Sequence, residues 1–137
     1  LMARKIADNP RILVASADYL KASGTPMSPA ELSNHNCIVL NENRLWGLRD
    51  SDGTTTEVRT QGNFTTSYGE ALTEAASAGA GIALKSKWDV LEQLINGTLV
   101  PVLPRFAVEP EWSVWAVRQV GDGARSIIGS HLKLRLG

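Results

Sequence analysis

Hydrophobic residues occur in short runs separated by turn residues, rather than in one long apolar stretch. Runs rich in aliphatic and β-branched residues are typical of buried strands. They predict strands over residues 1–7, 11–15, 37–41, 82–86, 98–103 and 112–118. A hairpin is predicted over 44–60, with its turn at Ser51-Asp52-Gly53. Pro101 cannot donate a hydrogen bond to a ladder, which places the strand 98–103 at the edge of a sheet.

Amphipathic segments alternate with these strands and predict helices over residues 16–24, 28–35, 67–78, 88–96 and 124–136. Three helices begin with a capping-box or similar pattern, in which Ser28 precedes Glu31, Ser67 precedes Glu70 and Ser86 precedes Asp89 by three residues. Gly97 ends the helix at 88–96. Because helices and strands alternate along the chain, the fold class is α/β.

The helix at 67–78 carries small residues on one face, at the spacing i, i+3, i+4, i+7: Leu72, Ala75, Ala76 and Gly79. Such a face lets a helix lie close to a sheet. Gly79 or Gly81 can supply the left-handed residue that ends this helix.

Three hydroxyl residues, Thr65, Thr66 and Ser67, stand at the start of the same helix. A helix N-terminus carries unpaired N–H groups and partial positive charge, so it can hold a carboxylate or another anion. The alternative is that Ser67 only caps the helix and the threonines fill a strand end. Trp88, at the front of its helix, is the best candidate among the four tryptophans to face a cleft.

Composition limits the classes of function that this chain can have. The chain has 137 residues, with 14 basic and 14 acidic side chains and a net charge of zero. A nucleic-acid surface needs a basic excess, so this segment alone should not hold DNA. Cys37 is the single cysteine, which excludes an internal disulfide and favours a reducing compartment. No apolar run is long enough to cross a bilayer, the first ten residues lack the apolar region of a secretory signal, and we expect the chain to be part of a longer protein.

Motifs for cofactors, metals and catalysis are weak. The A-G-A-G-I stretch follows a helix and precedes a strand, which is the reverse of a dinucleotide fingerprint. His35 and Cys37 have no further ligands in register, so Cys37 is interpreted as a buried strand residue and His35 as the end of a helix. No G-x-S-x-G occurs. We therefore expect no cofactor, no metal and no enzymatic activity.

An ordered set of motifs nevertheless resembles one family. It comprises RILVASADYL (11–20), GTPMSPAELSNHNCIVL (24–40), AGAGIALKSKWDV (78–90) and NGTLVPVLP (96–104). Together they resemble the effector-binding domain of LysR-type transcriptional regulators over about residues 10 to 118. The segment after residue 118 departs from the family pattern, because it lacks aromatic residues and carries Gly129 in the predicted helix.

The resemblance implies a fold like type 2 periplasmic-binding proteins, in which two α/β lobes are joined by crossover strands. This chain would supply mainly the second lobe with its crossover strands. Residues 1–14 would be the end of the first lobe and the outgoing crossover, and residues 15–112 the second lobe. Residues 113–137 would be the return crossover and a first-lobe helix.

The resemblance also implies a function. A small effector, anionic ones included, would bind in the cleft between the lobes, at Ser16, Thr65, Thr66, Ser67 and Trp88. Binding would be transmitted to a DNA-binding helix-turn-helix domain absent from this chain, in a cytoplasmic homo-oligomer, dimer or tetramer, without membrane contact. The alternatives are a solute-binding protein of the same fold and, less favoured, a small metabolic enzyme.

Overall fold

The computed structural model describes the backbone of residues 2–110, 112–118 and 124–130, and the side chains of residues 9–110. The larger part is a lobe built on a five-stranded sheet in the order β6-β3-β7-β2-β8. Its strands are β2 (Arg11–Ala15), β3 (Cys37–Leu40), β6 (Thr65–Thr66), β7 (Ile82–Ser86) and β8 (Val100–Val102). β3 runs parallel to β6 and β7, whereas β2 is antiparallel to β7 and β8. The edge position predicted for the strand with Pro101 is confirmed.

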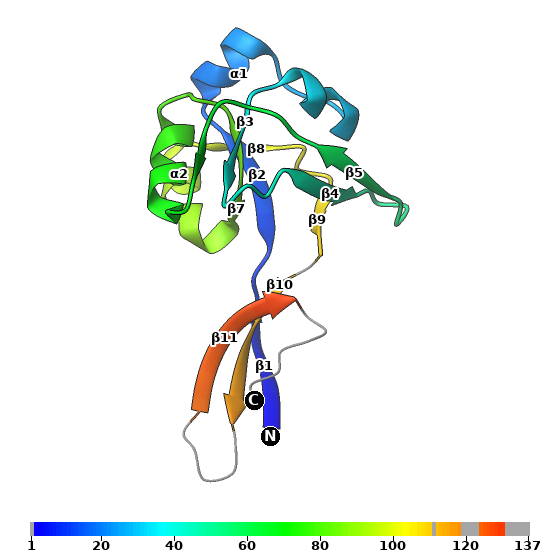
Figure 1. The fold of residues 1–137 in the computed structure, drawn as a ribbon, viewed down its shortest axis with the longest axis vertical. Helices are drawn as coiled ribbons and strands as arrows, with labels where there is room; N and C mark the ends of the chain where they lie inside the picture. Colours follow the sequence, from blue (N-terminus) through cyan, green and yellow to red (C-terminus); the bar gives the residue numbers. More distant parts are fainter. Residues whose placement is uncertain (1, 111, 119–123, 131–137) are drawn as a thin grey trace.

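Two smaller sheets complete the described chain. One has the order β5-β4-β9, with β4 (Leu45–Arg49), β5 (Thr55–Arg59) and β9 (Ala107–Glu109). The other has the order β1-β10-β11, with β1 (Met2–Asp8), β10 (Trp112–Arg118) and β11 (Ala124–Ser130). Figure 1 shows β1, β10 and β11 extending away from the lobe, with β2 continuing the path of β1 into it. The predicted hairpin is confirmed as β4 and β5, with Gly53 in its turn at φ +86°.

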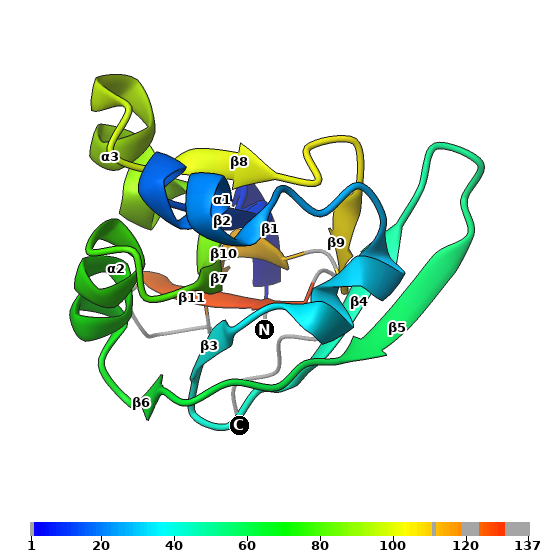
Figure 2. The ribbon, with the colours of Figure 1, turned by 90° about the horizontal axis from the view of Figure 1, so that it is seen from above.

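Helical segments cover the two faces of the central sheet. They are α1 (Ala17–Ser23), η1 (Pro29–Asn34), α2 (Gly69–Ser77), η2 (Lys87–Val90) and α3 (Leu91–Asn96), of which η1 and η2 are 3₁₀ helices. Seen from above, α2 and α3 lie at one side of the lobe and β4 and β5 at the other (Figure 2). The segment predicted as one helix over 88–96 is the 3₁₀ helix η2 followed by the α-helix α3. Gly97 ends α3 with φ +81°.

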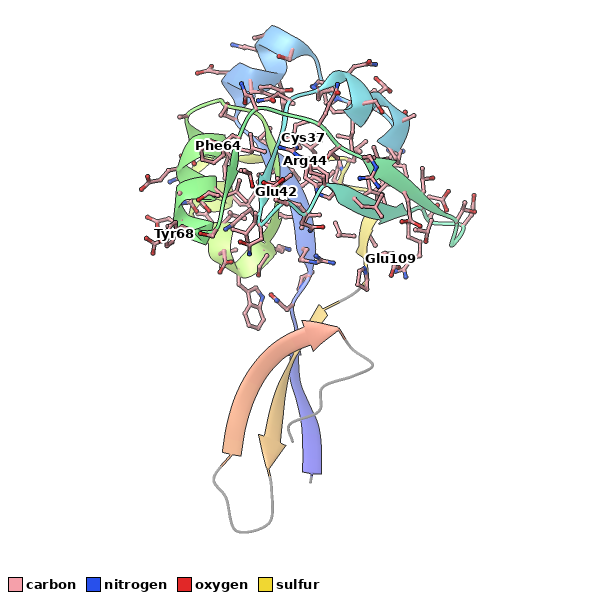
Figure 3. All side chains as sticks on the ribbon, in the orientation of Figure 1. Cys37, Glu42, Arg44, Phe64, Tyr68 and Glu109 are labelled. Atoms are coloured by element: carbon pink, nitrogen blue, oxygen red, sulfur yellow. The ribbon has the colours of Figure 1, made fainter. Side chains whose placement is uncertain are left out.

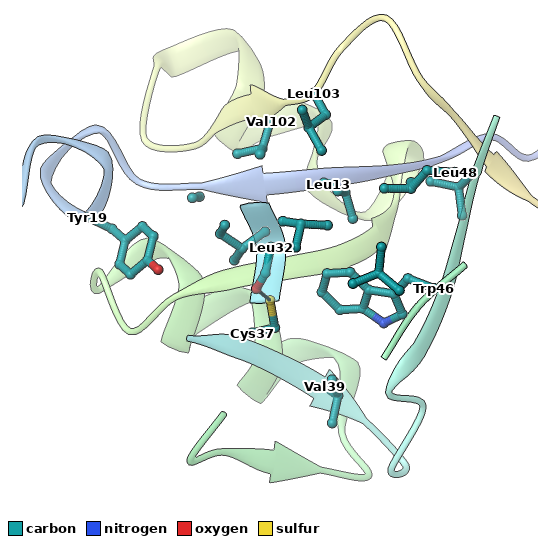
Figure 4. Packing of buried hydrophobic residues seen from close by; sticks show 13 residues of the cluster. Leu13, Tyr19, Leu32, Cys37, Val39, Trp46, Leu48, Val102 and Leu103 are labelled. Atoms are coloured by element: carbon teal, nitrogen blue, oxygen red, sulfur yellow. Dashed lines mark hydrogen bonds between the residues drawn. The ribbon is translucent and has the colours of Figure 1, made fainter. Parts of the chain in front are cut away.

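Successive residues of the central strands point to opposite faces, and each face has its own core. Leu13, Cys37 and Ile82 belong to one cluster, together with Trp46 of β4 (Figure 4). The second cluster contains their chain neighbours on these three strands and packs against helical residues; it comprises Val14, Ile38, Ala83, Leu72, Ala76, Val90 and Leu99. The small-residue face predicted for α2 is thus the face that packs on the sheet.

The last predicted helix is wrong over its described part. Residues 124–130 form β11, which pairs with β10 in antiparallel register from Ala124 to Ser130. Ile127 and Ile128 are β-branched and Gly129 is a poor helix former, so cross-strand pairing outweighs the helical periodicity. The remaining residues of that prediction, 131–136, lie outside the described residues.

The predicted capping boxes are not formed. The Ser28 hydroxyl donates to the Glu31 carboxylate at 3.2 Å instead of accepting from the helix backbone. α2 begins at Gly69, and no side chain caps it. Ser67 lies outside the helix, because the Thr66 hydroxyl accepts from the Tyr68 N–H at 3.1 Å and keeps this segment in a turn.

Two glycines after α2 have separate roles. Gly79 has φ +90° and follows the helix end, as predicted for one of the two. Gly81 does not adopt a positive φ; there a Cβ atom would lie 2.2 Å from the Asn36 carbonyl oxygen. This close approach exists because the Ile82 N–H donates to the same carbonyl at 2.9 Å, where β3 and β7 begin to pair.

We expect Gly81→Ala to lower the free energy of unfolding by at least ~2 kcal/mol, since the clash is with backbone that cannot move without breaking the pairing of β3 and β7. Gly97→Ala is the matched control, because Gly97 has a left-handed helical conformation, φ +81° and ψ 5°, with open space around it. It should lose only the ~1 kcal/mol of an unfavourable backbone conformation. Urea unfolding measures both, and equal losses would contradict the close-contact explanation.

Candidate functional site

A cavity of about 400 Å³ opens at one end of the central strands. It lies where the parallel strands β3 and β7 end and where the antiparallel strand β2 begins, since Arg11 pairs with Ser86. Its floor is apolar and includes Ile38, Val39 and Trp46. In open α/β sheets, ligands bind in the crevice outside the carboxyl ends of the strands, so the position alone marks this cavity as the candidate site.

Arg11 brings positive charge to the cavity from the first residue of β2. Its guanidinium Nη2 donates to the Pro110 carbonyl oxygen at 2.8 Å. Burial lowers the pKa of Arg11, and the carboxylate of Glu109 partly offsets that shift. An arginine remains protonated at physiological pH under such a shift, so the charge persists.

Lys85 supplies a second positive charge, from β7. Its side chain is 5% exposed, and Nζ donates to the Gly69 carbonyl oxygen at 2.9 Å. Burial lowers the pKa of Lys85, while Asp89, whose carboxylate lies 4.0 Å away, opposes the shift. Asp89 is largely exposed, so water screens its charge more than that of the buried ammonium group.

The lining therefore carries two cations and one anion, together with neutral hydrogen-bonding groups that can donate to a ligand. The neutral polar residues in the lining are Asn9, Asn41, Asn43 and Ser86. This combination of an apolar floor, convergent amides and a net positive charge is suited to a small molecule that carries a carboxylate or a similar anion.

Of the predicted site residues, only Trp88 lines this cavity. Its side chain is 52% exposed, so it stands at the opening rather than in the core. Trp46, by contrast, is 1% exposed and its indole N–H donates to the Asn43 carbonyl at 2.8 Å, which makes it part of the floor.

The hydroxyl cluster lies beside the cavity without lining it. Thr65 and Thr66 form β6, and Thr66 pairs with Leu40, which belongs to the lining. Ser67 is exposed and follows directly. In Figure 3, Phe64 and Tyr68 mark the two ends of this segment on the side of the lobe where α2 lies. The three hydroxyl residues thus lie at the same strand ends as the cavity, on or directly after β6, the strand next to β3.

Ser16 lies at the opposite ends of the strands. It follows the last residue of β2, and its hydroxyl accepts from the Tyr19 N–H at 3.1 Å as the N-cap of α1. Because β2 is antiparallel to β7, the start of β2 is near the cavity and its end is remote from it. The structure does not bring Ser16 together with Trp88 and the hydroxyl cluster.

Cys37 and His35 are structural residues, as interpreted from the sequence. Cys37 is fully buried in β3, and burial raises the pKa of its thiol to about 12, with Arg44 opposing the shift. His35 ends η1, and its Nδ1 lies 2.8 Å from the Tyr19 hydroxyl. In the part of the chain that the structure describes, no group of three His, Cys, Asp or Glu side chains could share a metal ion.

Sequence reasoning missed Arg11 and Lys85. Both carried a signal, because each is a lone charge within an otherwise aliphatic strand, in RILVA and IALKS respectively. Both stand next to a strand end, where a polar residue can reach the carboxyl edge of a sheet. Their convergence on one cavity required the register of β2 and β7.

Comparison with known proteins points to the same family as the sequence motifs. The sequence profile of the family described as the LysR substrate binding domain matches residues 1–127. The HTH-type transcriptional regulator DmlR of Escherichia coli K12 is 38% identical over 121 residues, covering 85% of this chain and 38% of DmlR. The HTH-type transcriptional regulator CrgA of Neisseria meningitidis is 34% identical over 106 residues, covering 75% of this chain and 35% of CrgA.

Solved structures agree. The full-length structure of the Vibrio cholerae virulence activator AphB matches with a TM-score of 0.77 and 33% identity over 84% of this chain and 40% of AphB. The regulatory domain of AphB from Vibrio vulnificus matches with a TM-score of 0.76 and 30% identity, covering 84% of this chain and 57% of that one. The AmpR effector domain of Pseudomonas aeruginosa, at 18% identity and a TM-score of 0.55, supports the fold alone.

The fold is of the periplasmic-binding-protein type found in LysR regulatory domains, and the relatives are named as transcription regulators. The chain belongs to the LysR substrate-binding domain family. It spans a little over a third of the length of the regulators that it matches in sequence. Among the described residues, no helix is both long and apolar enough to cross a membrane.

The raised pKa of Cys37 predicts a pH dependence of stability. Above pH 9 the thiol of the unfolded chain ionises, whereas the folded chain keeps its proton up to about 12. The unfolded state then binds fewer protons, so the free energy of unfolding falls as pH rises, by up to ~1.4 kcal/mol per pH unit.

Cys37→Ala should remove this contribution between pH 9 and 11 in urea titrations. Tyr19, whose pKa is raised mainly by burial and least by Cys37, contributes to both proteins, so most of its contribution cancels in the comparison. Parallel pH curves for the wild type and the variant would show that Cys37 is not protected in the folded state.

Proposed function

We propose that this chain is the effector-sensing part of a LysR-type transcriptional regulator and that it binds a small anionic molecule in the cavity at the carboxyl edge of its sheet. The first lobe would close over this edge, so that the effector lies between the lobes. DNA binding would belong to a helix-turn-helix domain outside this chain, in a cytoplasmic homo-oligomer.

The observation that carries the proposal is the joint presence of Arg11 and Lys85 in one cavity beside the crossover segments. Two cations, one buried and one half-buried, in a small apolar-floored space attract an anion, and Asp89 and Glu109 are acidic side chains that already act on Lys85 and Arg11. A carboxylate from solution would add to this compensation.

The proposed domain boundaries are those of a two-lobed fold. Residues 1–14 would form the outgoing crossover with the end of the first lobe, residues 15–112 the second lobe, and residues 113–137 the return. The antiparallel pairing of β1 with β10 supports two crossovers that run side by side.

Thr66 and Ser67 would extend the site for an effector larger than the cavity, because Thr66 pairs with the lining residue Leu40. Thr65, exposed on the same short strand, is the outermost of the group. Trp88 would cover the effector at the opening. The proposal does not include Ser16, whose hydroxyl caps α1 at the opposite edge.

The solute-binding alternative has the same fold but receives no support from the relatives, which are named as transcription regulators. Among the described residues, no observation specifically favours transport or enzymatic chemistry. The described residues that line the cavity include no nucleophile paired with a base.

Replacing the buried cation tests the proposal. Lys85→Met keeps the length of the side chain but removes its charge, so binding of benzoate or succinate should weaken by roughly tenfold, or ~1.4 kcal/mol. Isothermal titration calorimetry measures the affinity, and tryptophan fluorescence, to which Trp46 and Trp88 of the lining contribute, gives a second readout. Binding should also weaken with added salt.

Lys21→Met is the matched control, because Lys21 is exposed on α1 at the other edge of the sheet. It should bind both carboxylates like the wild type. Urea unfolding of both variants shows whether the folds are retained. Equal affinity of wild type and Lys85→Met for these anions, with both proteins folded, would refute an anionic site at this cavity.

A further inference from the structure

We propose that Arg11 links occupancy of the cavity to the two crossover segments, by holding the return segment through Pro110 while it faces the bound anion. This inference rests on the proposed function, because it assigns a regulatory role to one residue of the same site. Arg11 is then a positioning residue for the hinge as well as a binding residue.

The contact with Pro110 joins two distant parts of the chain. Arg11 is the first residue of β2, directly after the Asn9-Pro10 break that separates it from β1. Pro110 follows β9 and precedes β10, and its carbonyl accepts from Nη2 of Arg11 at 2.8 Å across 99 positions of sequence. One side chain of the cavity wall therefore touches the segment through which the chain leaves the lobe.

The charges around this contact hold it in place. Glu109, next to Pro110, attracts the Arg11 guanidinium and also forms an ion pair with Arg49 of β4. Figure 3 shows Glu109 at the lower end of the lobe, next to the connection toward β10. The second cation of the cavity, Lys85, instead donates to the Gly69 carbonyl on the side of α2.

The outgoing segment is fastened to the same wall. The Ser86 hydroxyl donates to the Asn9 side-chain carbonyl at 2.6 Å, and the Lys87 N–H donates to the Pro10 carbonyl at 2.9 Å. Asn9, Arg11 and Ser86 all line the cavity. The outgoing segment therefore ends on lining residues, and the return segment contacts one lining residue, Arg11, through Pro110.

Guanidinium chemistry makes the link possible. Arginine has five N–H donors in a planar fork and a permanent positive charge, so the group that holds the Pro110 carbonyl can also attract a carboxylate bound in the cavity. A bound anion then favours the arrangement in which the fork is fixed, and that arrangement fixes Pro110. Such a ligand shifts the hinge only by its differential affinity for the two arrangements, which is the requirement for coupling.

Hydrogen exchange measured by mass spectrometry tests the link without a ligand. Arg11→Gln removes the charge and the fork, and peptides covering β9 and β10 should then exchange about tenfold faster, while β3 and β7 stay protected and report the fold. Arg59→Gln, an exposed arginine on β5, is the matched control and should leave all peptides unchanged. Unaltered exchange in β9 and β10 of a folded Arg11→Gln would overturn the inference.

The same measurement with saturating succinate separates the inference from the proposed function. In the wild type, succinate should slow exchange in β9 and β10. Arg11→Lys, which keeps the charge but not the fork, should still bind succinate by calorimetry and should fail to slow this exchange. Binding to the wild type without slower exchange overturns the link alone, whereas no binding of succinate or benzoate to the wild type overturns the proposed site and the link together.

Discussion

Burial of the central strands on both faces is the constraint on which the rest of the lobe depends. In β2, β3 and β7, alternate residues enter two different cores, so neither face of the sheet is left for water or a ligand. Polar chemistry can then occur only where the strands end. The cavity lies where strands end, and its two cations, Arg11 and Lys85, come from the first residue of β2 and the residue before the last of β7.

The same constraint brings the site and the hinge together. A chain that enters and leaves the lobe must do so at a strand end, and here both passages lie beside the cavity, at Asn9-Pro10 and at Pro110. Some lining residues, among them Asn9 and Arg11, therefore also hold the segments that enter and leave the lobe. In the proposed mechanism, sensing and transmission need no separate machinery, because one half-buried arginine lines the cavity and contacts the return segment.

Prediction from the sequence succeeded for elements with strong local signals and failed where hydrogen-bond partners come from far away. The strands with aliphatic runs, the edge position of Pro101 and the hairpin at Gly53 each follow from local rules. The cap assigned to Ser67 failed because Thr66 holds the turn before the helix. The helix assigned to 124–136 failed over 124–130 because pairing with β10 is available there, and a local pattern carries no information about that partner.

The sequence by itself determined the fold class, the family and the polar character of one sheet edge, since these depend on periodicity, on turn residues and on the order of motifs. Only the tertiary structure decided which polar residues share a cavity. It joined Arg11 to Lys85 and separated both from Ser16, although Ser16 is much nearer to Arg11 along the chain. The physical reason is strand direction: an antiparallel neighbour brings the start of one strand to the end of another, and register, which no local pattern encodes, fixes which side chains meet.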